Sequence, residues 1–179
     1  MSRDDLIRLL EGRDPLAAVR AFGIAPPEAV RVTGPAPGDR LVDGDREGPV
    51  ADHRAAHARG TSSEAVVAYG DGVPAGAVAD RLLELGALAR ETGLLAAVTP
   101  VPSEGSSARP GSWGVEDLVV IAAARGVVPG AAIRPSWECL GPPAAQVALA
   151  FGATEWAVPD GDDTDVERLA RAAGCRVAR

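Results

Sequence analysis

The strongest constraint on the fold is a regular alternation of strand-like and helix-like segments from Pro49 to the end of the chain. Short apolar runs, typical of buried strands, alternate with segments whose apolar residues recur every three or four positions, as on one face of a helix. Several of the helix-like segments stop at a glycine. Strands that alternate with helices indicate a parallel sheet joined by right-handed crossovers, so the pattern predicts an α/β fold.

The predicted helices are Pro49–Arg59, Val78–Glu91, Val115–Arg125, Pro142–Phe151 and a last one that starts at the capping-box pattern Thr164-x-x-Glu167. The predicted strands are Ser62–Tyr69, Leu94–Pro100, Ala131–Arg134 and the segment "TEWAV" from Thr154. Residues 1–48 form a separate N-terminal part ahead of the α/β region 49–179, within one compact domain. In this part the spacing predicts two short helices in Ser2–Phe22, a strand could form at Ala29–Thr33, and the Gly/Pro/Asp-rich stretch Gly34–Gly48 indicates a loop.

Composition excludes several classes of function. A net charge of -7, with no cluster of arginines, argues against nucleic-acid binding. The longest apolar runs, such as Leu118–Ala124, are too short to span a membrane, and the polar start has no apolar signal core, so we expect a cytoplasmic protein. All 18 basic residues are arginine, which excludes lysine Schiff-base chemistry and is typical of a high-G+C, actinobacterial genome.

The cysteines and histidines of the chain give little indication of a metal site. Cys139 and Cys175 are too few and too far apart for a zinc ribbon or a disulfide framework, and we interpret both as small reduced core residues. His53 and His57 stand four residues apart on one predicted helix, a spacing that can seat a metal. No acidic third ligand follows at a useful spacing, so helix packing is the favoured interpretation.

Candidate ligand-binding residues gather where two predicted strands end. Arg134, Ser136, Trp137 and Glu138 follow one strand, where arginine offers a planar fork for an anion and tryptophan a face for a purine ring. The alternative is that Arg134 pairs with Glu138 and Trp137 closes the core. The remaining candidates lie on or after neighbouring strands and are Glu64, Tyr69, Asp71 and Glu155.

Five consecutive phrases carry a resemblance to a known family: "HRAAHARG", a strand ending "YG", "RLLELGALARETG", "GVEDLVVIAAAR" and "SWECLGPPAAQVALAFGA". In order and spacing, residues 52–174 resemble the C-terminal half of the barrel of the radical S-adenosylmethionine enzymes of the futalosine route to menaquinone, aminofutalosine synthase and dehypoxanthine futalosine cyclase. The pattern GP-x-x-AQ-x-AL-x-FGA is the most specific part. The resemblance implies a partial, half TIM-type barrel of about four to five parallel strands with outer helices, whose ligand side lies at the carboxyl ends of the strands.

Departures from the family decide the expected function. The enzymes need a C-x3-C-x2-C loop to hold a [4Fe-4S] cluster, and this chain has only two cysteines, 36 residues apart, so we expect no iron–sulfur cluster and no S-adenosylmethionine binding. Asp71 stands where the family tends to have a histidine. We therefore expect a non-catalytic accessory protein or interaction partner linked to menaquinone biosynthesis. The alternative is a small enzyme or binding protein that retains a nucleoside-like ligand pocket.

Half a barrel leaves its inner face and two strand edges open. Parallel strands as apolar as "EAVVAY" are normally covered on both faces. Either a second copy or a full-length relative covers the inner face, or the N-terminal helices fold over it through Leu6, Leu9, Leu10, Leu16 and Phe22. The loose composition of Gly34–Gly48 favours a second chain.

Overall fold

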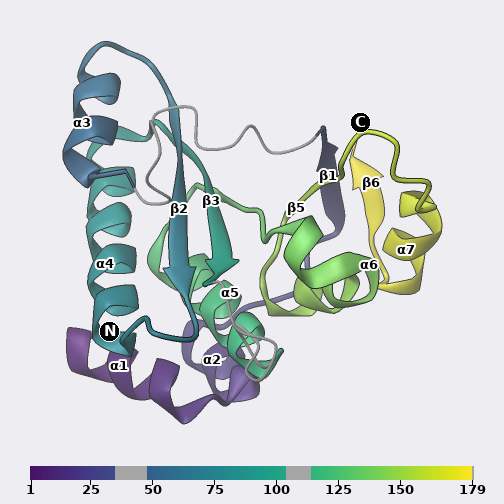
Figure 1. Ribbon diagram of the computed structural model, residues 1–179, viewed down its shortest axis with the longest axis horizontal. Coiled ribbons are helices and arrows are strands. Elements are labelled where there is room, and N and C mark those ends of the chain that lie inside the picture. Colours follow the sequence, from purple (N-terminus) through teal and green to yellow (C-terminus); the bar gives the residue numbers. More distant parts are fainter. Residues whose placement is uncertain (35–47, 104–113, 179) are drawn as a thin grey trace.

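The computed structural model describes residues 1–34, 48–103 and 114–178, so most of the predicted loop Gly34–Gly48 lies outside the described residues. The described chain forms two parallel three-stranded sheets, with the orders β2-β3-β4 and β5-β1-β6 (Figure 1). The strands are β1 Ala29–Thr33, β2 Ser63–Tyr69, β3 Leu95–Pro102, β4 Ala132–Ile133, β5 Glu155–Ala157 and β6 Arg176–Ala178. The helices are α1 Arg3–Gly12, α2 Pro15–Phe22, α3 Val50–Ala58, α4 Ala75–Thr92, α5 Val115–Val127, α6 Trp137–Ala148, the short 3-10 helix η1 Leu149–Phe151 and α7 Val166–Ala172.

The predicted α/β class is confirmed, because strands and helices alternate and every strand pairing is parallel. The strands do not close into a barrel, and they form two sheets where the sequence predicts one partial barrel of four or five strands. The two sheets meet at Thr154, whose N–H donates to the carbonyl of Ile133 at 2.9 Å and whose carbonyl accepts from Arg31 N at 3.0 Å. The predicted strands therefore form, but their grouping differs.

The sheet β2-β3-β4 has two unlike faces. Along β2 the side chains alternate between buried and half-buried, and the buried ones, such as Val67 and Tyr69, join the core formed with α4 and α5. The opposite face, here called the inner face, carries Glu64, Val66 and Ala68 of β2 beside their register partners Ala97, Thr99 and Val101 of β3. Apart from the fully buried Ala97, these side chains are half-buried, so the described chain covers the inner face only in part.

The N-terminal helices do not cover the inner face. Both predicted helices form, and α1 begins with a capping box between Ser2 and Asp5. They pack on α4 and α5, near the carboxyl ends of β2 and β3 (Figure 1). Leu6 and Leu10 are buried there, whereas Leu16 is 58% exposed. Because α4 and α5 lie on the other side of the sheet, the less favoured alternative, a cover of the inner face by the N-terminal helices, is wrong.

Three local predictions need correction. The last helix is capped by Asp165, whose side chain accepts from Arg168 N, while Thr164 N donates to Asp162. The helix α6 starts at Trp137 instead of Pro142, with a break at Gly141, where φ is 72° and glycine avoids the strain of a side chain. Cys139 is exposed on α6, so only Cys175 is a core cysteine.

None of the helices in the described part of the chain combines the length and the hydropathy that a membrane span requires.

Candidate functional site

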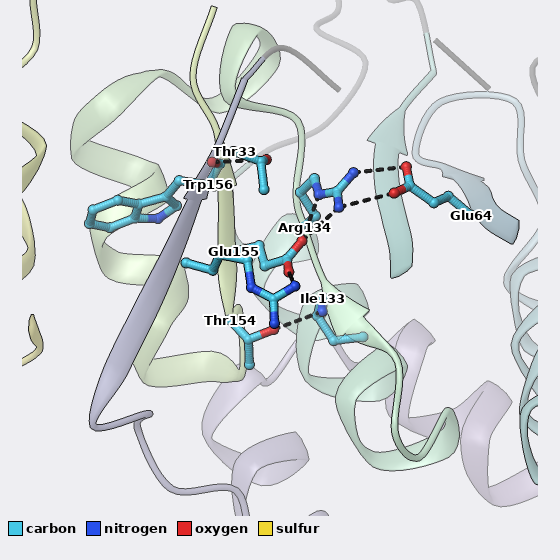
Figure 2. A network of polar contacts seen from close by, with 8 residues as sticks. Thr33, Glu64, Ile133, Arg134, Thr154, Glu155 and Trp156 are labelled. Atoms are coloured by element: carbon cyan, nitrogen blue, oxygen red, sulfur yellow. Dashed lines mark hydrogen bonds and ion pairs between the residues drawn. The ribbon is translucent and has the colours of Figure 1, made fainter. Parts of the chain in front are cut away.

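A buried ion-pair network occupies the inner face and brings together three of the predicted ligand-binding residues. Arg134 follows β4 and reaches across β3 to Glu64 on β2 (Figure 2). Its Nη1 and Nη2 donate to the two carboxylate oxygens of Glu64 at 2.8 and 3.2 Å. On its other side, Nε and Nη2 donate to Oε2 of Glu155 at 2.9 and 2.7 Å. The guanidinium thus holds a carboxylate on each side.

The sheet registers explain why these side chains meet. In β4 and β3, Ile133 pairs with Val98, and the N–H of Arg134 continues this ladder by donating to Val98 O at 2.9 Å. Glu64, Ala97 and Ala132 are register partners. Arg134 stands two residues beyond Ala132, so it lies on the same face as Glu64, because side chains alternate between the two faces of a sheet. Glu155 and Arg31 are register partners in β5 and β1, and Arg31 Nη1 lies 3.0 Å from Oε1 of Glu155.

The network is closed in the sense that the chain's own carboxylates occupy the guanidinium of Arg134, and its centre is buried. Arg134 and Glu155 are 6% and 2% exposed, and Glu64 is about one-third exposed. Burial alone would lower the pKa of Arg134, but its hydrogen bonds to Glu64 and Glu155 outweigh burial and raise this pKa above its ordinary value. Two arginines face two carboxylates, so the network is neutral. An anionic ligand would have to displace a carboxylate from Arg134 before it could bind there.

Arg134 pairs with Glu64 and Glu155, so the part of the alternative interpretation that pairs it with Glu138 is wrong. Glu138 is exposed in the first turn of α6, and Ser136 caps that helix, since its Oγ accepts from Cys139 N at 3.3 Å. Trp137 is 4% exposed and belongs to the core, as the alternative interpretation expected. Its ring meets that of Trp156 edge-on, with centroids 5.7 Å apart, and its Nε1 donates to Asp162 at 2.8 Å. Neither face of the indole is open to a purine.

Tyr69 and Asp71 lie at a second place, a hollow of about 630 Å³ at the carboxyl end of β2. The charged groups of its lining are Glu11, Arg13, Asp71 and Glu116. The Tyr69 hydroxyl points away into the core and donates to Asp117 at 2.5 Å. Burial, and next the charge of Asp117, raise the pKa of Tyr69, so its phenol stays protonated and serves packing. The eight predicted ligand-binding residues therefore lie at three places: the ion-pair network on the inner face, the hollow at the carboxyl end of β2, and the start of α6.

The histidine pair packs inside the molecule, as the favoured interpretation expected. His53 and His57 are 1% and 5% exposed and both contact Ser63. No group of three or more potential metal ligands occurs within residues 1–34, 48–103 and 114–178. The cysteines also do not fit a [4Fe-4S] cluster, since such a site needs three thiolates and the Cys175 thiol is buried and donates to Pro27 O.

Sequence reasoning missed Arg31 and Asp117. Arg31 lies in the N-terminal part, and its contact with Glu155 depends on a parallel pairing between strands more than 120 residues apart. Asp117 looks like an ordinary acidic residue in the first turn of a helix, where it would favour the helix dipole. Asp117 is 8% exposed and packs against Tyr69, and only its place directly before the apolar run Leu118–Ala124 of α5 could suggest this burial.

No protein-family model matches the chain, and no curated protein gives a significant match to it.

Proposed function

We propose that this protein is a non-catalytic accessory or interaction partner that descends from a radical S-adenosylmethionine enzyme and serves menaquinone biosynthesis by the futalosine route. The family and the pathway rest on the resemblance of residues 52–174. The observation that supports a non-catalytic role is the closed network on the inner face. There, Glu64 and Glu155 occupy the guanidinium fork of Arg134 that a substrate carboxylate or phosphate would otherwise use.

The partly covered inner face supports an interaction role. Val66, Ala68 and Val101 are half-buried on this face, and the N-terminal helices pack elsewhere. Parallel sheets are normally covered on both faces. We propose that a full-length radical S-adenosylmethionine relative or a second copy of this chain supplies the missing cover. The accessory role of this protein would then consist of this association.

Co-expression with a full-length aminofutalosine synthase or cyclase tests this role. We expect a complex that survives size-exclusion chromatography with light scattering, or, without the relative, a homodimer. Val66→Glu should abolish either association, because it places a charge in the centre of the contact. Val147→Glu is the matched control, since Val147 is 49% exposed on α6 and is not one of the residues that form the inner face. A monomer at all concentrations that ignores the relative would contradict the proposal.

A second candidate function is the binding of a nucleoside-like molecule without catalysis. The hollow beside Asp71 favours it, because carboxylates such as Asp71, Glu11 and Glu116 accept hydrogen bonds from sugar hydroxyls. This site lies at the carboxyl end of a parallel strand, where α/β folds commonly bind ligands. The aromatic residue in the lining of this hollow, Tyr69, is 1% exposed and offers no open face for a base, which makes nucleoside binding the weaker candidate.

A further inference from the structure

A second polar cluster lies at the opposite, amino-terminal end of β2 and plays no part in the inner face. His53 and His57 on α3, Ser63 at the start of β2 and Thr92 at the end of α4 form one hydrogen-bonded chain. His53, His57 and Ser63 are at most 5% exposed, and Thr92 is half-buried. The chain fastens α3 to the rest of the molecule, together with the buried Ala56, the partly buried Val50 and the exposed ion pair between Arg54 and Glu91 of α4.

The direction of each hydrogen bond follows from its last acceptor. Thr92 Oγ1 donates its only proton to the carbonyl of Leu88 at 2.9 Å, so it must accept from Nδ1 of His57 at 2.7 Å. Neutral His57 then carries its proton on Nδ1, and its Nε2 accepts from the Ser63 hydroxyl at 2.8 Å. Ser63 in turn accepts from Nδ1 of His53 at 2.8 Å. With both imidazoles neutral, this arrangement gives each hydrogen bond of the chain one donor and one acceptor.

A proton added to either imidazole disrupts this arrangement of donors and acceptors. On His57 it would sit at Nε2 and point at Ser63, which would have to turn its own proton toward His53 and force a change of tautomer there. On His53 it would sit at Nε2, a buried atom for which residues 1–34, 48–103 and 114–178 provide no hydrogen-bond acceptor. With both imidazoles charged, two N–H donors would face one serine oxygen. The closed chain therefore resists protonation.

Like burial, most of the surrounding charges lower the pKa values of the two histidines. Burial, and next the charge of Arg81 on α4, lower the pKa of His53, and Asp52 opposes them. Burial, and next Arg54 on α3, lower the pKa of His57. Arg54 is itself paired with the exposed Glu91 of α4. When α3 is released, both imidazoles regain the ordinary pKa of about 6.5 and bind protons more readily, so acid favours the released state.

We infer that the chain from His53 to Thr92 is an acid-sensitive latch, which holds α3 on β2 and α4 at neutral pH and releases it in mild acid. Release would expose the start of β2, which is an edge strand of its sheet. Exposed edges of this kind are sites where another strand can pair. The latch concerns α3 alone, so it stands whether or not the proposed function of the inner face is correct.

Hydrogen exchange followed by mass spectrometry on the whole chain tests the latch at pH 7.5 and 5.5, with rates corrected for the intrinsic effect of pH. Each histidine that binds a proton only in the released state raises the opening equilibrium about tenfold for each pH unit below about 6.5. We expect protection of the α3 amides to fall about tenfold to a hundredfold, while the amides of α5 change much less.

Variants decide whether the histidines cause this response. His53→Gln combined with His57→Gln should give equal α3 protection at both pH values, because neither glutamine titrates. Arg59→Gln, an exposed change at the C-cap of α3 whose charge does not act on either histidine pKa, should keep the response. If the double variant does not fold, His53→Gln alone should halve the response on a logarithmic scale. Unchanged α3 protection in acid, equal losses in α3 and α5, or a response that survives removal of the histidines would overturn the inference.

Discussion

Arg134→Met is expected to lower the free energy of unfolding by about 3–5 kcal/mol, the cost of leaving a buried charge without its partner. Methionine has a similar apolar stem, so the change removes the guanidinium and little volume. Glu155, which is 2% exposed, would keep only Arg31, whose side chain is 69% exposed. Urea denaturation at pH 7.5 measures the loss.

Two further variants show that the cost comes from the charge. Glu64→Gln should cost about 1 kcal/mol or less, because Glu64 is one-third exposed and an amide oxygen still accepts from Arg134. Arg134→Met combined with Glu155→Gln should recover part of the loss, since no buried charge then lacks its partner. A loss below about 1 kcal/mol for Arg134→Met would mean that water or another group replaces the guanidinium, and the network would not be closed.

Trp156→Ala is expected to cost about 3–5 kcal/mol, the usual loss for a large aromatic residue in a packed core. Trp156 is fully buried on β5, stacks edge-on against Trp137, and donates from Nε1 to Ala145 O at 3.0 Å. Its removal separates the sheet β5-β1-β6 from α6. Thermal and urea unfolding followed by circular dichroism measure the change.

Trp156→Phe is the matched control, because it keeps a ring against Trp137 but leaves the carbonyl of Ala145 without its donor. We expect it to cost less than the alanine variant. Equal stability of wild type and Trp156→Ala would be incompatible with a core between α6 and β5.

Most elements could be predicted because their signals are local. The helical spacing in Val78–Glu91 and the apolar run of Ser62–Tyr69 depend on neighbouring residues, and both elements form almost as predicted. The strand β6 is missed because three residues are too few to show a period, and only its pairing with β1 makes it a strand. The division into two sheets also depends on pairings between distant segments, which local patterns do not encode.

The candidate site could be predicted only in part for the same reason. The sequence predicts Arg134 as a site residue because it follows a strand and Glu155 because it lies on the next strand, and the structure joins both with Glu64. The role expected for Arg134, a free fork for a ligand, depends on what surrounds it in space. Two carboxylates from other strands fill that fork, and no spacing in the sequence indicates this. For the same reason the sequence does not distinguish between Trp137 as a face for a purine ring and Trp137 as a core residue. Its contacts with Trp156 and Asp162 place it in the core.

The central claim, that the chain's own carboxylates occupy the guanidinium of Arg134 and that the inner face holds no small-molecule ligand, is tested most directly by equilibrium dialysis of the wild-type protein. The probes are adenosine, futalosine-type nucleosides and S-adenosylmethionine, each up to 1 mM, roughly the weak limit of specific binding. The account predicts no saturable binding of any probe. Saturable binding that Glu64→Gln or Arg134→Met weakens would place a ligand on the inner face and contradict the claim. Binding that only Asp71→Ala weakens would assign the ligand to the hollow beside β2 and replace the accessory role by the second candidate function.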